Sequence, residues 1–182
     1  MVITRVVLTY REYATLPDDG RRYEIHDGEL SVTPAPGTRH QIVSSNLYDI
    51  VRRHVKSRDL GLVLYAPLDV ILSDTTVVQP DIVFVANDRQ SLVSERGVEG
   101  APTLAVEIVS PSTIGIDRVT KLQLYARHGV PFYWLVDPEA RALEAYVLGA
   151  EGYSVALRAS GSDRCSPPPF DDLMLVPASL FR

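Results

Sequence analysis

Residues 104–110 read Leu104-Ala105-Val106-Glu107-Ile108-Val109-Ser110. A short and almost wholly apolar run of this kind is typical of a central strand that is buried on both faces of a sheet. Glu107 interrupts the run, and an ionised carboxylate in an apolar strand is costly unless it is paired or bound to a metal. For a single buried acid, a structural ion pair is a more common explanation than a function. The stretch therefore predicts a buried strand and a nearby group that compensates Glu107.

The segments after this strand alternate between helix and strand patterns. Residues 111–128 have helical spacing, and Gly129 provides a C-terminal stop for that helix. We expect three strands to follow, over residues 130–136, 141–148 and 152–157. Three consecutive prolines at 167–169 rule out regular structure there. The apolar residues within 173–181 are expected to pack as a cover onto the core.

The segments before this strand begin with a short helix pattern at residues 10–16. Two alternating runs flank Asp27-Gly28, which is the strongest short hairpin signal in the chain. The strands of this hairpin are expected over residues 22–25 and 29–33, and an amphipathic helix over residues 38–58. Two more strands are expected over 62–72 and 77–85, followed by a polar loop with one helical turn over 87–102. This order predicts an α/β fold: a mixed sheet flanked by helices, with an N-terminal β-hairpin.

Composition limits the class of protein. The chain has 182 residues, of which 46% are hydrophobic, so we expect a single domain over residues 1–182 with its core at about 37–148. Cys165 is the only cysteine and cannot form an internal disulfide, which fits a reducing cytoplasm. No apolar run is long enough for a membrane span.

Charge weighs mildly against a nucleic-acid partner, because the net charge is −5 and phosphate contacts need Lys and Arg. Basic residues do cluster at positions 52–58, at the end of one expected helix. A solvated helix face is a more common explanation of such a cluster than a dedicated DNA contact.

Asp81 follows Pro80 at the entry of an expected strand. By itself, Pro-Asp is common turn chemistry. If this strand is a neighbour of residues 104–110, however, Asp81 and Glu107 converge at one end of the sheet, where they repel each other unless a divalent cation lies between them. Carboxylate oxygens without a His or Cys cluster favour Mg²⁺ or Mn²⁺ over zinc.

Lys121 lies fourteen residues beyond Glu107, on the helix that must pack back over the sheet. Its neighbours in sequence include apolar residues, and Tyr125 shares its helix face at i, i+4 spacing. An ordinary surface lysine is an equally good reading of this residue alone. A lysine that reaches inward to the two acids can orient an attacking water or stabilise charge that grows on a phosphate.

Several blocks in order carry a family resemblance: residues 22–30, 79–81, 106–113, 117–125 and 133–138. On these residues the chain resembles the PD-(D/E)XK restriction-endonuclease-like superfamily, and within it the Uma-two family of bacterial endonucleases. The resemblance covers most of residues 10–148. It implies a restriction-endonuclease-like fold and metal-dependent hydrolysis of DNA.

Carried over to this chain, the resemblance makes Asp81 and Glu107 metal ligands and the carbonyl of Ile108 a third ligand. The superfamily pattern has lysine two residues after the glutamate, where this chain has Val109. The resemblance therefore points to Lys121 as the lysine that has moved to the next helix.

Two further positions are weighed for the site. Glu24 on the hairpin is a better fourth acid than Glu29, which could face solvent, and Asp49 and Asp59 lie too far along their helix. His40 is in register with the apolar face of the helix at 38–58, and a core histidine bonded to the backbone is its first reading, with a site contact second.

The leading functional prediction is an endonuclease that uses Mg²⁺ or Mn²⁺ held by Asp81 and Glu107, with DNA as the substrate. One alternative is a binding or assembly module that keeps the fold without turnover, suggested by Val109 and the acidic net charge. Another is a hydrolase of a small phosphorylated compound, although no glycine-rich phosphate loop is present. A homodimer is expected, in which the aromatic residues at 132–134 or the apolar tail could form the contact, although burial of these aromatics in the monomer is the safer expectation.

Overall fold

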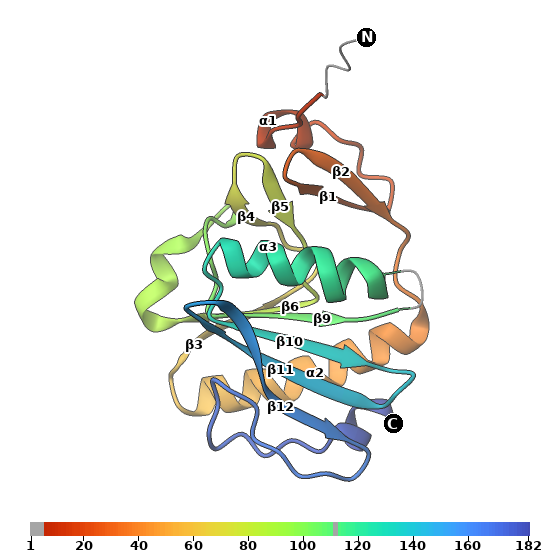
Figure 1. Cartoon of the computed structure of the whole chain (residues 1–182), viewed down its shortest axis with the longest axis vertical. Coiled ribbons are helices and arrows are strands. Elements are labelled where there is room, and N and C mark those ends of the chain that lie inside the picture. The colour runs from red at the N-terminus through yellow and green to blue at the C-terminus, as the bar shows by residue number, and fades with distance from the viewer. Residues whose placement is uncertain (1–5, 111–112) are drawn as a thin grey trace.

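The computed structural model describes residues 6–110 and 113–182 and contains two sheets (Figure 1). The main sheet has the strand order β12-β11-β10-β9-β6-β3, and the second sheet has the order β2-β1-β5-β4-β8-β7. The strands of the main sheet are β3 (Gly61–Tyr65), β6 (Ile82–Ala86), β9 (Leu104–Ile108), β10 (Phe132–Asp137), β11 (Ala142–Gly149) and β12 (Gly152–Ser160). The strands of the second sheet are β1 (Arg22–His26), β2 (Glu29–Thr33), β4 (Val70–Ser73), β5 (Thr76–Val78), β7 (Val93–Ser94) and β8 (Gly97–Val98).

The helical segments are α1 (Tyr10–Tyr13), α2 (Thr38–Ser57), the 3-10 helix η1 (Asn87–Leu92), the π-helical segment η2 (Ile116–Lys121), α3 (Leu122–Arg127) and the 3-10 helix η3 (Pro177–Phe181). The predicted end of the helix before Gly129 is confirmed, and Gly129 has a positive φ of 75° that suits glycine. The predicted start at 111 and 112 lies outside the described residues. Within the described part of the chain, each helix is too short or too polar to cross a bilayer.

Strand β9 lies inside the main sheet, parallel to β10 and antiparallel to β6. All five of its residues are buried, so the prediction of a strand covered on both faces is confirmed. The α/β class with a mixed sheet and flanking helices is also confirmed. Tyr133 and Trp134 on β10 are fully buried in the monomer. Burial in the monomer was the safer of the two expectations for these aromatic residues.

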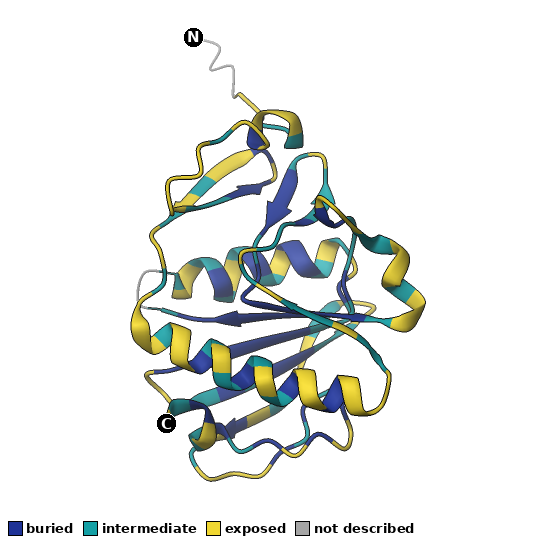
Figure 2. Ribbon diagram, turned by 180° about the vertical axis from the view of Figure 1, so that it is seen from behind, coloured by how far each residue is buried: buried dark blue, intermediate teal, exposed yellow. Residues whose placement is uncertain are grey.

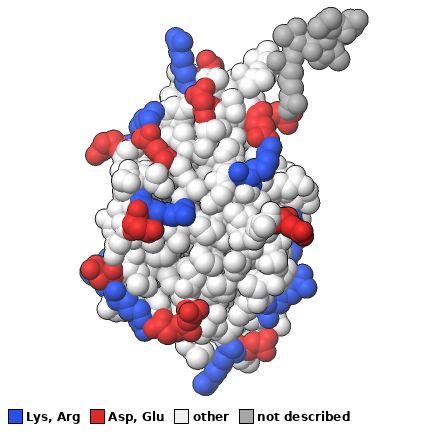
Figure 3. All heavy atoms as spheres, turned by 60° about the vertical axis from the view of Figure 1, so that its left-hand side comes forward, with Lys and Arg blue, Asp and Glu red and all other residues white. Residues whose placement is uncertain are grey.

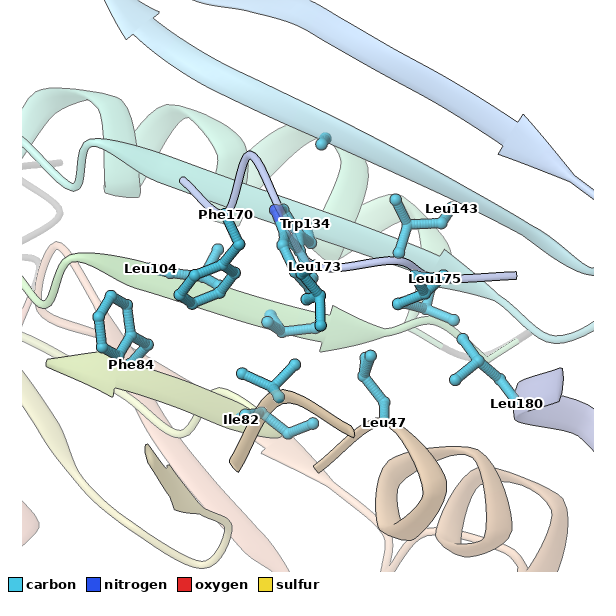
Figure 4. Packing of buried hydrophobic residues seen from close by; sticks show 14 of the residues in the cluster. Leu47, Ile82, Phe84, Leu104, Trp134, Leu143, Phe170, Leu173, Leu175 and Leu180 are labelled. Atoms are coloured by element: carbon cyan, nitrogen blue, oxygen red, sulfur yellow. The ribbon is translucent and has the colours of Figure 1, made fainter. Parts of the chain in front are cut away.

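Helix α2 covers one face of the main sheet, and α3 lies on the other (Figures 1 and 2). The apolar residues at helical spacing on α2, among them Val43, Leu47 and Val51, are fully buried against the sheet. Figure 4 shows Leu47 among side chains of the sheet and of the C-terminal segment. Leu173 and Leu180 belong to the same core cluster, so the predicted apolar cover by the tail is confirmed.

The hairpin of β1 and β2 forms around Asp27 and Gly28, as predicted. Both residues have positive φ values, 52° and 82°, which is the backbone of a tight primed turn. Strand β1 also pairs with β5 through Ile25. The hairpin is therefore part of the second sheet.

Two predicted strands are each divided between the two sheets. The run at 62–72 splits into β3 and β4, and the run at 77–85 splits into β5 and β6. The breaks fall at Pro67 and Pro80, because proline has no N–H to continue a strand ladder. The short strands β7 and β8 were also missed within the predicted loop, whose helical turn is η1. The second crossing between sheets brings Asp81 to the end of the main sheet.

Candidate active site

A pocket of about 130 Å³ lies where β9 ends, beside β1, the first turn of α2 and η2. Four buried acids line it: Glu24, Asp81, Glu107 and Asp117. Together with Lys121, which is also buried, these acids are called the carboxylate pocket below. The pocket is thus built from both sheets and both main helical layers.

The β6–β9 register brings Asp81 and Glu107 together. Ile82 is opposite Val106 in the antiparallel pair, so one step further Asp81 is opposite Glu107, and directly opposed residues point to the same face. Both side chains line the pocket. The sequence-based expectation that these two acids converge at one end of the sheet is therefore met by the geometry.

Asp81 is almost fully enclosed by hydrogen-bond donors. Its Oδ1 accepts a bond of 2.7 Å from Arg22 Nη1, and its Oδ2 accepts bonds of 2.8 Å from the Ile108 N–H and 3.0 Å from His40 Nε2. Burial alone would raise the pKa of Asp81, but the bond and charge of His40, the charge of Arg22 and the Ile108 amide together lower it. Asp81 is therefore held as an oriented carboxylate.

His40 and Ile108 differ from expectation in how they reach the site. The predicted backbone hydrogen bond of His40 is wrong, because Nε2 bonds to Asp81 and, among the described residues, Nδ1 has no hydrogen-bond partner. Ile108 lines the pocket, and its amide group is what contacts Asp81. A ligand role for its carbonyl stays a prediction.

Glu107 is compensated from the α3 side. Its Oε1 accepts a bond of 2.9 Å from Lys121 Nζ and one of 2.7 Å from the Tyr125 hydroxyl. Burial raises the pKa of Glu107 well above its usual range, Lys121 opposes this rise, and the nearby charges of Asp117, Asp81 and Glu24 add to it. The ion pair that the sequence required for a buried acid is present, but it does not balance the full local negative charge.

Lys121 is shared between three acids. Its Nζ lies 2.9 Å from Glu107 Oε1, 2.9 Å from Glu24 Oε1 and 3.7 Å from Asp117 Oδ1. Burial would lower the pKa of Lys121, but the charges of Glu107, Glu24 and Asp117 outweigh it and raise the pKa. Lys121 is therefore a permanent cation, suited to stabilising negative charge and not to accepting a proton.

Glu24 joins the hairpin to this network. Its Oε1 also accepts a bond of 2.6 Å from the Gln79 N–H, and its Oε2 lies 3.1 Å from His26 Nε2. Burial would raise the pKa of Glu24, but Lys121 and His26 lower it to about 2. Of the other acids considered from the sequence, Glu29, Asp49 and Asp59 are exposed and do not line the pocket.

Arg22 and Asp117 are pocket residues that the sequence analysis missed. Each has a signal in the sequence: Arg22 is two residues from Glu24 on one strand face, and Asp117 is one helical turn before Lys121. Asp117 lies in η2, where the wider π-helical turn recurs at functional sites. Burial raises the pKa of Asp117, with Lys121 opposing the rise.

The carboxylate pocket offers the donor atoms and the negative charge that a hard divalent cation prefers, but its described side chains are not arranged around a preformed metal site. Four carboxyl groups face two permanent cations, Arg22 and Lys121, and oxygen donors are those that Mg²⁺ and Mn²⁺ prefer. In residues 6–110 and 113–182, no group of three or more His, Cys, Asp or Glu side chains is arranged as a metal cage. The oxygen atoms that a cation would need are instead engaged by Arg22, His40 and Lys121.

A solved structure shares this architecture. It is described as a "putative nuclease belonging to DUF820" from Anabaena variabilis, with a TM-score of 0.79 and 22% identity over 96% of this chain and 97% of that one. This protein therefore has the same mixed α/β fold as that chain.

Sequence comparison defines the family. The model of the Uma2 family, described as "Putative restriction endonuclease", matches residues 10–175. A relative from Synechocystis sp., "Uncharacterized protein slr1290", is 24% identical over 144 residues, which is 79% of this chain and 75% of the relative. Because the family model matches most of its length, this chain belongs to the Uma2 (Uma-two) family.

Proposed function

We propose that this protein is a metal-dependent endonuclease that hydrolyses phosphodiester bonds in DNA. The observation that carries the proposal is the carboxylate pocket, in which Asp81, Glu107 and Lys121 meet at the end of the main sheet. Membership of a family described as a restriction endonuclease and the fold shared with a described nuclease support a nuclease role.

In this proposal Asp81 and Glu107 hold Mg²⁺ or Mn²⁺. The bound ion supplies Lewis-acid polarisation of the phosphate and makes a water molecule more acidic. The Ile108 amide and His40 hold Asp81 in one orientation, and Tyr125 does the same for Glu107. These second contacts keep both carboxylates in place before substrate arrives.

Lys121 stabilises the negative charge that grows on the scissile phosphate. It takes the part of the lysine that the superfamily pattern has at position 109. Val109 is itself 4% exposed and packs in the apolar cluster under α3, so a lysine there would have no room in this core. Glu24 and Asp117 position the Lys121 ammonium between them.

The test is cleavage of varied DNA substrates with Mg²⁺ or Mn²⁺, by the wild type, Asp81→Asn and Lys121→Ala. We expect each substitution to lower kcat/KM by about 10²- to 10³-fold, as the loss of one preorganised charge does elsewhere. Arg158→Met is the matched control, because Arg158 is 70% exposed, pairs with Glu144 and does not line the carboxylate pocket. Equal cleavage by all four proteins would overturn the assignment, and circular dichroism checks that each variant is folded.

A binding or assembly module without turnover is the second candidate. It is favoured by one observation: Arg22, His40 and Lys121 already form hydrogen bonds to the carboxylate oxygens that a metal would use. Calorimetric titration with Mg²⁺ separates the two, since the nuclease must bind the ion and Asp81→Asn must weaken that binding. If the wild type shows no heat of Mg²⁺ binding, the result favours the binding or assembly module.

A further inference from the structure

A second hollow, of about 370 Å³, opens beside the carboxylate pocket. It is called the tyrosine hollow here, and its own lining is Gln41, Ser44, Ser45, Tyr48, Tyr65 and Ala66. The two hollows have Arg22 and His40 in common, and both of these residues bond to Asp81. The tyrosine hollow therefore adjoins the carboxylate pocket at Arg22 and His40.

The backbone fixes how near the two hollows are. Tyr65 is opposite Ile82 in the β3–β6 ladder, next to Asp81, and the Ala66 N–H bonds to the Asp81 carbonyl at 3.1 Å. Tyr65 shares the α2 face of the sheet with Ile82, whereas the Asp81 side chain points to the other face. A ligand group on Tyr65 would therefore reach a phosphate at the carboxylate pocket around the end of the sheet, past Arg22 and His40. One nucleotide of a strand has this arrangement, with its base next to its own phosphate.

An open aromatic surface forms the floor of the hollow. Tyr65 is 58% exposed, which is unusual for a large ring in this chain, and it packs against Tyr48 with ring centroids 4.7 Å apart at an interplanar angle of 61°. The edge contact with Tyr48 fixes the ring of Tyr65 and leaves its outer part exposed. Exposed, fixed aromatic rings are the surfaces on which unpaired bases stack.

Polar groups without partners form the wall. Gln41, Ser44, Ser45 and Tyr48 follow i, i+3, i+4, i+7 spacing and lie on one face of α2. Within residues 6–110 and 113–182, none of their side chains makes a hydrogen bond to another group, whereas other serines such as Ser57 bond to the backbone. These donors and acceptors suit the edge of a base.

The charges around the hollows do not suit a duplex backbone. The arginines near them are each paired with an acid: Arg21 with Asp19, Arg22 with Asp81 and Arg39 with Glu139. In Figure 3, in which the left-hand side of Figure 1 comes forward, Lys and Arg lie beside Asp and Glu and large areas are uncharged. Duplex DNA is bound through many phosphate contacts, and the face in Figure 3 shows no continuous basic surface for them.

We infer that the tyrosine hollow binds an unpaired base of the DNA strand whose phosphate enters the carboxylate pocket, so that the substrate is single-stranded DNA. This inference rests on the proposed function, because that proposal is what identifies the bound strand as DNA. Tyr65 stacks on the base, and the polar face of α2 bonds to its edge. Arg22, at the junction of the two hollows, faces the phosphate between them.

The test measures binding without divalent ions, in EDTA, so that no cleavage is needed. A single-stranded oligonucleotide with one 2-aminopurine reports affinity by anisotropy and stacking by fluorescence quenching. We expect Tyr65→Ala to weaken binding by roughly 5- to 150-fold, the loss of one stacked base, and to abolish the quenching. Tyr65→Phe keeps the ring and should bind as the wild type does. Met174→Ala is the matched control, because Met174 is 62% exposed and lies outside both hollows.

Four results would overturn the inference: no binding of the single strand, unchanged affinity of Tyr65→Ala, tighter binding of the same sequence as a duplex, or equally tight binding of a free nucleoside monophosphate. The last result would identify a nucleotide pocket in place of a strand site. If Tyr65-dependent binding is found but DNA is never cleaved with Mg²⁺ or Mn²⁺, only the proposed function fails. The two conclusions can therefore be told apart.

Discussion

At the scale of single residues, Lys121 decides the charge of the site. The residue is 5% exposed, and its ammonium contacts Glu107 and Glu24, which come from different sheets. A buried charge whose partner is removed costs more than the pair contributes, because the remaining charge is left without water. The same residue is thus expected to affect stability and turnover.

Lys121→Met should lower the free energy of unfolding by about 3–5 kcal/mol near neutral pH, because it leaves buried carboxylates without their cation. Burial already raises the pKa of Glu107, so the folded state takes up a proton there more readily than the unfolded state. The variant should therefore recover stability as the pH falls from about 8 to about 5. Urea unfolding across this range measures both effects.

A loss of stability that is the same at every pH would contradict the ion-pair argument. The control is Arg158→Met, which removes a pair whose arginine is exposed and should change the free energy of unfolding by less than about 0.5 kcal/mol.

Tyr125→Phe removes only the hydroxyl that donates to Glu107 at 2.7 Å in a fully buried position. We expect a loss of about 1.5–3 kcal/mol in unfolding free energy, since the bond is made to a charged group. Tyr146→Phe is the matched control: its hydroxyl also bonds to a glutamate, Glu144, at 2.9 Å, but in a partly buried site. Thermal or urea unfolding should rank Tyr125→Phe as the more damaging change, and the reverse order would count against the buried network.

Some of the site could be read from the sequence at this scale, and some could not. Asp81, Glu107, Lys121 and Glu24 lie in one pocket, as the spacing and the family resemblance indicated. Arg22 was missed because an arginine beside a hairpin usually faces solvent, and only the pairing of β1 with β5 in the folded chain turns it toward Asp81. Spacing in the sequence predicts which side chains share one face of a helix or strand, but not which other element packs against that face.

At the scale of elements, the strongest local signals gave the correct structure. The Asp27-Gly28 hairpin, helix α2 and strands β9, β10 and β11 follow their patterns, because turn chemistry and periodicity are local properties. The division of 62–72 and 77–85 between two sheets could not be derived from apolar pattern, because strands of either sheet are equally apolar. Pro67 and Pro80 were the only local signals of the change.

Gly28→Ala tests the hairpin. Gly28 has φ +82°, and a Cβ there would overlap with the side chain of Val7, so we expect a loss of about 1–2 kcal/mol or more in stability. Gly115→Ala is the opposite control, because Gly115 has helical dihedrals of −68° and −40° and no atom of the described residues lies within 4 Å of an added Cβ. That variant should gain about 0.4–1 kcal/mol. Equal midpoints in a thermal melt of both variants would contradict this reading of the turn.

At the scale of the whole molecule, two sheets and both helical layers meet at one pocket with excess negative charge. A divalent ion that binds only the folded chain must raise the apparent stability by mass action. We expect Mg²⁺ at 100 times its Kd to add about 2.7 kcal/mol to the unfolding free energy. Asp81→Asn should reduce this gain, and Met174→Ala should leave it intact. A melting temperature of the wild type that does not respond to Mg²⁺ would argue against a metal site.

The bond network around Lys121 also has a mechanical consequence. Glu24 belongs to the second sheet and Glu107 to the main sheet, so the Lys121 ammonium forms ion pairs with both sheets across the pocket. A substitution that loosens the packing between the sheets, such as one at Ile25 beside Glu24 on β1, should separate Glu24 from Glu107 before either sheet unfolds. Heating should therefore abolish turnover several degrees before the secondary structure disappears, which makes loss of function the earliest sign of damage to this molecule.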